Sequence, residues 1–470
     1  MWRRQIEGTP MLMDWSMLDT WIVITAALAA MGCALPGTFL LLRRQSLMGD
    51  ALSHSVLPGI VLAYLAVDQL QHAGWWSTST ALAWRHPMLF VGAAATAILS
   101  GALSELLARA GRLDANAALG VVYTAMFAAG LLLIRLAADA AHIDPGCVLY
   151  GNLETIVTDT VGQTQIPRAV IVNGVILLLN SGALLLSYKE LQLCTFDPAL
   201  ATALGIPARL VQQLLLAATG ATVVAAFESV GSILVIAMLV VPPACGVLLS
   251  DRLSGVLGFS LLIASLSAVF GHVGALVMPD VVRWTLAWPE LGDISTAGMM
   301  SVAGGAAFLG CWLLAPRHGL VRQWRDHQRL QRRILSEDIL GALYRIEELV
   351  PNAAGELRAK ADLAAALSVS PGRLEVCLQR LKQRGELEIS GATARLTPTG
   401  RQAAQNLVRS HRLWESYLAH HFHLELPRLH ASAEQVEHFL DPQLREELAE
   451  ELQQPGRDPH GSSIPPSGST

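Results

Sequence analysis

The chain has few charged residues, and its cysteines form no recognisable motif. Only 15% of its 470 residues are charged and 52% are hydrophobic, whereas a soluble domain carries about 25% charged residues. The six cysteines are scattered without a CxxC pair, which argues against disulfide-stapled domains and cysteine zinc sites. No glycine-rich phosphate-binding loop ending in Lys-Ser or Lys-Thr occurs, so the chain does not hydrolyse ATP by that route. A mean hydropathy of +0.43 indicates that most of the chain lies in lipid.

Long apolar runs fill the first two thirds of the chain. A membrane helix needs about 20 apolar residues, and two of the runs meet at Phe227-Glu228-Ser229, which predicts a broken or re-entrant helix there. We therefore expect eight or nine spans. The runs are 21–42, 51–67, 88–107, 117–136, 169–186, 210–226, 230–249, 255–278 and 297–314.

Arginines gather directly after the last apolar run. The positive-inside rule therefore places everything beyond residue 316 in the cytoplasm. The arginines are Arg317, Arg322, Arg325, Arg329, Arg332 and Arg333.

The last third of the chain is charged and amphipathic. Segments 336–349, 356–368 and 371–384 show helical periodicity with start signals, and 386–396 alternates polar and apolar residues as a hairpin does. Segment 399–422 is again helical. Three helices followed by a hairpin predict a winged helix-turn-helix, with 371–384 as its recognition helix.

Asp50 and His54 lie four residues apart, on one face of a predicted helix. Ionisable groups buried in a membrane cost several kcal/mol unless they pair or line a polar path, and both residue types bind Mn²⁺, Fe²⁺ or Zn²⁺. We expect a metal path here, and the alternative is a hydrogen-bonded pair that joins two helices. Glu228 lines the same path or lies at a helix break. His272 is expected to be a packing residue.

Five ordered motifs between about residues 15 and 318 resemble the ABC-type metal-uptake permeases, which import zinc, manganese or iron. They are Arg43–Gly59, His142–Asp144 with Val148–Asn152, Phe196–Ala199 with Ala203–Ile206, Val230–Val235 with Val241–Ala244, and Ser295–Gly298 with Ala315–Leu320. The resemblance implies that Asp50 and His54 contact the ion. It also implies a separate ATPase, a second permease copy and an extracytoplasmic metal-binding protein. The ATPase would dock at Phe196, Asp197, Pro198, Leu204 and Gly205.

The segment from about 336 to 465 resembles the diphtheria-toxin-repressor-like metal-sensing regulators. The motifs are Leu396–Gly400, Val408–Leu418, His430–His438 and Pro459–Pro465. Their spacings suit one helical face, because carboxylates and imidazoles recur at four residues, a set that fits Mn²⁺ or Fe²⁺.

The resemblance assigns metal ligands by position. The first helix departs from the manganese-type pattern, since Gly341 stands where a second ligand is expected, and the alternative is a degenerate regulator kept for docking or dimerisation. Glu434 stands where iron-type regulators have cysteine, which favours manganese. The assigned ligands are Asp338, His411, Glu415, His430, Glu434, Glu437 and His438.

DNA binding is the weaker expectation for this domain. Arg373, Arg380 and Lys382 give the recognition helix a basic face. Glu375 and Glu386 dilute that charge, and a membrane tether restricts access to DNA.

The predicted fold is an all-α polytopic membrane protein of eight or nine transmembrane helices, followed by a cytoplasmic winged helix-turn-helix and a helical dimerisation domain. Because Gly, Pro and Ser are frequent near the end, we expect a disordered tail there. The predicted boundaries are a permease domain over 1–318, a basic linker over 319–335, a winged helix over 336–400, a metal-binding and dimerisation domain over 401–454 and the tail over 455–470.

The predicted function is the permease subunit of an ATP-driven importer of divalent metal ions in a bacterial inner membrane. The chain itself is not an enzyme. Mn²⁺ or Fe²⁺ is the expected substrate and regulator, and the cytoplasmic domain senses it. The alternatives are a zinc importer permease and a membrane-tethered, metal-dependent transcription regulator.

Overall fold

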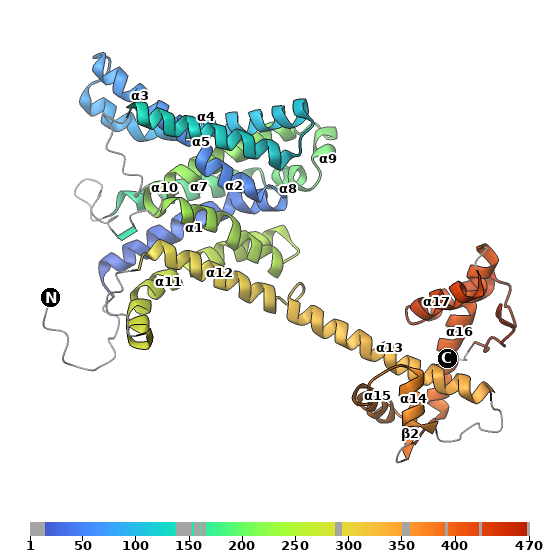
Figure 1. The fold of residues 1–470 in the computed structure, drawn as a ribbon. Helices are drawn as coiled ribbons and strands as arrows, with labels where there is room; N and C mark the ends of the chain where they lie inside the picture. Colours follow the sequence, from blue (N-terminus) through green and yellow to red (C-terminus); the bar gives the residue numbers. More distant parts are fainter. Residues whose placement is uncertain are drawn as a thin grey trace. The chain divides into compact units, whose positions relative to one another are not determined.

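A computed structural model describes residues 15–137, 153–154, 160, 166–286, 294–349, 358–390, 393–422 and 425–467. The chain divides into an N-terminal unit that ends at Arg322 and a C-terminal unit that begins at Gln323. Figure 1 shows the helices of the first in blue to yellow and those of the second in orange to red. The predicted loop motif around His142 and Asp144 lies outside the described residues.

The N-terminal unit is a bundle of helices. They are α1 (Met17–Leu42), α2 (Ser46–Ser55), α3 (Leu57–His72), α4 (Thr78–Gly111), α5 (Ala115–Ala137), α7 (Arg168–Leu186), α8 (Tyr188–Phe196), α9 (Pro198–Ala203), α10 (Ala208–Leu249), α11 (Leu253–Leu286) and α12 (Thr296–Leu314).

Seven helices in the described ranges are long and apolar enough to cross a membrane, and Ile233–Leu249 is a shorter apolar helix. The prediction of a polytopic helical membrane domain is confirmed. The predicted run 51–67 is divided between α2 and α3 at Val56. Pro58 explains the division, because it has no N–H to donate to the carbonyl of residue 54. Neither half alone has the length of a span.

The predicted break between residues 210 and 249 is present. Gly231 adopts φ 76° and ψ 166° inside α10, a conformation that glycine adopts readily and other residues avoid. The two halves of α10 therefore meet at a kink two residues beyond Ser229.

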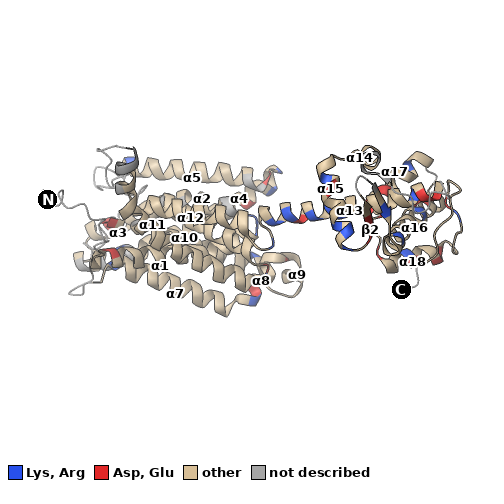
Figure 2. Cartoon of the chain, turned by 90° about the horizontal axis from the view of Figure 1, so that it is seen from below, with Lys and Arg blue, Asp and Glu red and all other residues tan. Residues whose placement is uncertain are grey.

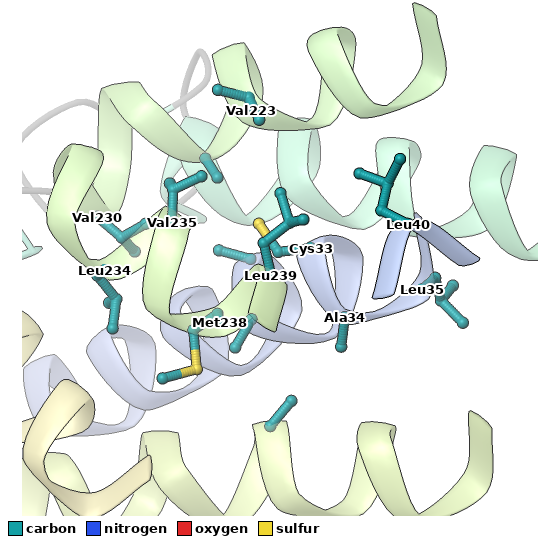
Figure 3. Packing of buried hydrophobic residues seen from close by; sticks show 14 of the residues in the cluster. Cys33, Ala34, Leu35, Leu40, Val223, Val230, Leu234, Val235, Met238 and Leu239 are labelled. Atoms are coloured by element: carbon teal, nitrogen blue, oxygen red, sulfur yellow. The ribbon is translucent and has the colours of Figure 1, made fainter. Parts of the chain in front are cut away.

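The core of this unit lies where α1 packs against α10 and α11. Figure 3 shows side chains of α1, including Cys33 and Leu40, in one buried cluster with Leu234, Met238 and Leu239 of α10. The backbones approach closely at Gly37, where an added Cβ atom would lie 2.1 Å from a carbonyl oxygen of α10. Small residues permit this close packing of membrane helices.

A polar network joins the starts of α1 and α12 to the middle of α11. Asp19 and Ser16 form a capping box at the start of α1. The buried ring of His272 in α11 lies 3.1 Å from Asp19 Oδ1 through Nε2 and 3.1 Å from Thr296 Oγ1 of α12 through Nδ1. His272 therefore has the packing role that the sequence predicts.

The C-terminal unit contains the predicted winged helix. Its strands form an antiparallel sheet in the order β1-β3-β2. Leucines of α13 and α15 pack against this sheet to form a separate core. The elements are α13 (Leu320–Leu349), β1 (Arg358–Ala359), α14 (Lys360–Ala366), α15 (Pro371–Gln383), β2 (Leu387–Ser390), β3 (Thr393–Leu396), α16 (Pro398–His421), α17 (Leu426–Val436) and α18 (Pro442–Glu451).

The predicted basic linker 319–335 is helical from Leu320, because no proline or glycine interrupts it and the four-residue spacing of Arg333 and Glu337 permits an ion pair of 2.8 Å. One segment differs from the sequence prediction: the tail that was expected to be disordered packs on α16 as far as Pro465. Arg409 donates a hydrogen bond of 2.8 Å to the Pro465 carbonyl, and Ile464 is buried.

Candidate metal centres

α2 carries Asp50 and His54, which were predicted to contact the transported ion. Its helical backbone sets the two residues one turn apart, while the side chain of Asp50 lies outside the described residues. The half-buried ring of His54 has its centroid 5.0 Å from that of Phe127 and 6.4 Å from that of Tyr123, both on α5. His54 therefore faces another helix of the bundle.

Glu228 lies in α10, three residues before the kink at Gly231, and its side chain is outside the described residues. α2 packs against α10, and an added Cβ atom at Gly49 would lie 2.8 Å from the side chain of Leu239. The structure thus brings together the helices that carry the predicted pathway residues.

The predicted ATPase-docking segment forms a short helical turn. Asp197 caps α9 by accepting a backbone hydrogen bond of 2.9 Å, Pro198 begins that helix, and Gly205 follows it at a φ of 83°. Phe196 and Leu204 are 61% and 65% exposed. Large apolar side chains presented outward by a capped turn are typical of an interaction surface.

In the C-terminal unit, Asp338, Glu437 and His438 form a group that we call the first cluster. One ligand atom from each lies within 4.8 Å of the others. His438 Nε2 lies 3.2 Å from Asp338 Oδ1 and 3.7 Å from Glu437 Oε1, and His438 Nδ1 lies 2.8 Å from Glu337 Oε2. α13 thus supplies Asp338 and Glu337, and the turn that directly follows α17 supplies the other two.

His411, Glu415 and His430 form the second cluster, again within 4.8 Å. His411 and His430 each lie within about 3 Å of Glu415 Oε1, at 3.1 and 3.0 Å. The other nitrogen of His411, Nδ1, lies 2.5 Å from Glu437 Oε2. His411 therefore connects the second cluster to the first.

The carboxylates around His438 favour its protonated form. Burial lowers the pKa of His438, but the hydrogen bonds to Asp338 and Glu337 and the negative charges of Asp338 and Glu437 outweigh burial and raise its pKa to about 9. The pKa of Glu337 is lowered, because hydrogen bonds from His438 and Arg333 and their charges outweigh the opposing effect of burial. Without a metal ion, a proton on His438 balances part of the negative charge.

The pKa values in the second cluster are shifted in the same directions, with the carboxylate lowered and the imidazole raised. Burial raises the pKa of Glu415, but the hydrogen bond and charge of His411, with the hydrogen bond from His430, lower it to about 2. Burial lowers the pKa of His411, yet its hydrogen bonds to Glu415 and Glu437 and the charge of Glu437 hold it above the ordinary value. An ionised carboxylate and two imidazoles therefore converge here.

Both clusters have the composition of a site for a divalent ion. They combine carboxylate and imidazole donors without a thiol, a set that suits Mn²⁺ and Fe²⁺. Asp338, Glu437 and His438 would hold one ion, and His411, Glu415 and His430 a second. Each imidazole that binds must first be neutral at its ligand nitrogen.

Glu434 and Gly341 lie apart from the first cluster. Glu434 is at the rim of the second cluster, 58% exposed, with Oε1 3.7 Å from His430 Nε2. Gly341 is buried, and an added Cβ atom would lie 3.1 Å from the side chain of Leu407. Position 341 therefore belongs to the packing between α13 and α16.

Sequence reasoning missed two residues at these clusters. Glu337 orients His438, and the need of a ligating imidazole for a second hydrogen-bond acceptor could have pointed to it. His460 Nε2 lies 3.4 Å from Glu415 Oε1. No spacing signal connects those two, since His460 is in the segment predicted to be disordered.

The cations proposed for DNA contact, Arg373, Arg380 and Lys382, lie exposed on α15.

Comparisons with known proteins agree with this architecture. The ABC 3 transport family matches residues 16–280, and the metal-binding and dimerisation domain of iron-dependent repressors matches 397–466. The manganese transport system membrane protein MntD of Bacillus subtilis is 36% identical over 306 residues, which are 64% of this chain and 94% of the relative. The zinc transport system membrane protein TroD of Treponema pallidum is 34% identical over 390 residues, 82% of this chain and 97% of the relative.

One solved structure has the same fold as the membrane unit. PsaBC from Streptococcus pneumoniae, in complex with Fab, matches 66% of this chain and 95% of that chain, with a TM-score of 0.50 and 22% identity. The family match covers more than half of the chain. The protein therefore belongs to the ABC 3 transport family and is a permease of an ABC metal importer with a repressor-like domain fused to its C-terminal end.

Proposed function

We propose that this permease imports Mn²⁺ or Fe²⁺ and that its C-terminal unit binds the same ion in the cytoplasm and restrains transport when the ion is abundant. The observation that carries the proposal is the pair of clusters joined through His411 and Glu437, 2.5 Å apart. Two adjoining sites rich in carboxylate and imidazole, with no thiol, favour these ions over the more thiophilic Zn²⁺.

The transport path runs past α2 in this proposal. Asp50 and His54 contact the ion in turn with water, and Glu228 lines the route where α10 is kinked. Irregular backbone at membrane depth is tolerated where it lines a cavity. The division of α2 from α3 and the kink at Gly231 both support a path between these helices.

Other chains complete the transporter. A separate ATPase docks on the exposed apolar side chains of α8 and α9, Phe196 and Leu204 among them. A second permease copy closes the path, and an extracytoplasmic protein delivers the ion. The proposed location is a bacterial inner membrane with the C-terminal unit in the cytoplasm, since the arginines that follow α12 favour that side.

Feedback follows from the charge of the first cluster. Three carboxylates, Glu337, Asp338 and Glu437, surround His438, and a divalent ion replaces the proton that otherwise balances them. Binding would fix the turn that follows α17 to α13, the helix that five residues separate from the end of α12. The bound and free states of the domain therefore differ at an element directly connected to the last span.

The test is metal uptake by vesicles that contain the permease and its ATPase, with Mn²⁺, Fe²⁺ and Zn²⁺ compared and the concentration on the cytoplasmic side varied. We expect Asp50→Ala to abolish uptake and the exposed His72→Ala to leave it intact. We expect His438→Ala to keep uptake but remove its inhibition by cytoplasmic Mn²⁺, with His420→Ala as the control. Normal uptake by Asp50→Ala contradicts the path, and unchanged inhibition in His438→Ala contradicts the feedback.

DNA binding is the competing function of the C-terminal unit, and the exposed cations of α15 are the observation in its favour. Footprinting with the full chain in detergent distinguishes the two. Metal-dependent protection of a defined DNA sequence, lost in Arg373→Ala, would favour a membrane-tethered regulator.

A further inference from the structure

The first half of α13 carries a row of arginines on one face. Arg322, Arg325, Arg329 and Arg332 follow at steps of three, four and three residues, which a period of 3.6 residues places along one side of the helix. We call these four residues the arginine stripe. All four are exposed, and Figure 2 shows the colour of Lys and Arg on successive turns of this helix.

Carboxylates compensate only part of the charge of this segment. Residues 317–333 contain six arginines and one aspartate, and two carboxylates outside the segment, Asp251 and Glu337, pair with Arg317 and Arg333. Asp326 lies 3.6 Å from Arg329, in a pair whose side chains are 51% and 69% exposed, and such a pair contributes little. The stripe therefore presents strong positive charge to its surroundings.

The start of α13 is fixed beside the end of the last candidate span. Five residues separate it from α12, and Gly319 donates a backbone hydrogen bond of 3.0 Å to Ala315. His318 Nε2 lies 3.0 Å from Asp251 Oδ1, and Arg317 also pairs with Asp251. The guanidinium of Arg322 donates to the Pro316 carbonyl. These contacts all lie within the N-terminal unit.

The chain length between α12 and the arginine stripe is short. A helix rises about 1.5 Å per residue, so Arg325 follows Leu320 by about 8 Å along the axis, about one Debye length at physiological ionic strength. Arg329 and Arg332 follow Leu320 by about 14 and 18 Å, so they would need direct contact with a phosphate group. Val321 and Trp324, 42% and 65% exposed, lie on the same turns, and tryptophan favours the membrane–water interface.

We propose that the arginine stripe binds the phosphate groups of anionic phospholipids in the leaflet next to the end of α12. Guanidinium groups pair with phosphate through two parallel hydrogen bonds. Basic clusters that directly follow a membrane helix bind anionic headgroups. Insertion of α12 brings the bilayer within reach of the residues that directly follow it. The inference rests on the proposed function only for the membrane insertion of α12.

The experiment titrates the full chain, purified in a neutral detergent, with short-chain phosphatidylglycerol and with phosphatidylcholine, and counts bound lipid by native mass spectrometry. The test variant is R325Q/R329Q/R332Q. The matched control, R384Q/R428Q/R457Q, removes the same charge from three exposed arginines elsewhere in the C-terminal unit. We expect the test variant to bind phosphatidylglycerol about 100-fold more weakly and the control to bind like the natural chain. The lysine variant R325K/R329K/R332K keeps the charge and should lose less than the glutamine variant.

Three results would overturn the proposal. If the test and control variants lose phosphatidylglycerol affinity equally, the attraction is unspecific. If neither variant loses affinity, the arginine stripe is not the lipid-binding site. Inorganic phosphate that binds as tightly as phosphatidylglycerol and displaces it would point to a free anion instead. Lipid binding is measured without metal or ATPase, so a failure of metal uptake in the same preparations would refute the proposed function and leave this result standing.

Discussion

Binding of Mn²⁺ to the first cluster should compete with a proton on His438. The pKa of His438 is about 9, because Asp338 and Glu337 hydrogen-bond to the protonated ring and outweigh its burial. At pH 7 about 99% of the ring is therefore protonated, which lowers the apparent metal affinity about 100-fold relative to the neutral ring. We expect the affinity to rise about tenfold per pH unit above pH 7 and to level off near pH 9.

Without metal, the same proton should make stability change in the opposite direction. A histidine whose pKa is raised from 6.5 to about 9 on folding stabilises the folded state fully below pH 6.5, and that stabilisation is lost as the pH rises towards 9. The upper limit of the loss is about 3 kcal/mol. The protection of α17 amides in the full chain, which is their exchange rate relative to the intrinsic rate at the same pH, should therefore fall with rising pH in the metal-free protein, whereas its Mn²⁺ affinity increases.

Calorimetric titration in buffers of different ionisation enthalpy measures the protons released per ion. We expect about one proton from His438 at pH 7. The variant His438→Ala should lose this release together with most of the affinity of the first cluster, and the exposed His420→Ala should behave like the natural chain. An affinity that does not change between pH 7 and pH 9 in the natural protein would refute the reasoning.

Three further predictions concern other parts of the molecule. Glu337→Ala should weaken Mn²⁺ binding about 10- to 100-fold by freeing the ring it orients, measured by the same titration; Glu337→Gln keeps an acceptor oxygen and should lose less, and equal losses would contradict an orienting role. Gly37→Ala puts a methyl group against a backbone carbonyl of α10 and should cost about 1–3 kcal/mol, seen as a lower thermal midpoint in detergent, whereas Gly305→Ala has open space; equal midpoints would contradict the packing argument. Phe196→Asp should stop the ATPase from co-purifying with the permease and the equally exposed Phe422→Asp should not; retention by both would exclude α8 as the docking site.

Membrane helices were the most predictable part of this fold. Each depends on the hydrophobicity of about 20 consecutive residues, a local property that the sequence displays directly. The break in α10 was also predictable, because Glu228 interrupts the apolar run near Gly231. The division at Val56 was harder to foresee, since apolar residues continue through it and only Pro58 marks the change.

The metal clusters were predictable only in part. His411 and Glu415 share one helical face, and so do His430 and Glu434, so spacing alone pairs them. The contact of His438 with α13 depends on how distant helices pack, and only the resemblance to regulators indicated it. Helical spacing even misplaced Glu434, which meets His430 at the surface and not His438.

The wrong prediction of a disordered tail has a physical cause. The Gly/Pro/Ser-rich segment was judged by composition, which reports the tendency of an isolated chain. Composition does not count partners supplied by the rest of the fold. In the structure the Pro465 carbonyl accepts a hydrogen bond from the buried guanidinium of Arg409. A buried arginine needs acceptors, so the ordered tail also completes the surroundings of α16.

The helical linker changes how a sensing domain could act on transport. A flexible basic linker would let the domain bind metal without mechanical consequence for the permease. α13 instead runs unbroken from Leu320, beside the end of α12, to the residues that hold the first cluster. An ion bound by Asp338 and Glu437 would join this helix to the turn that follows α17, whereas lipid phosphate on the arginine stripe would hold its first turns at the membrane. Both proposed binding events therefore involve residues of the same helix, α13.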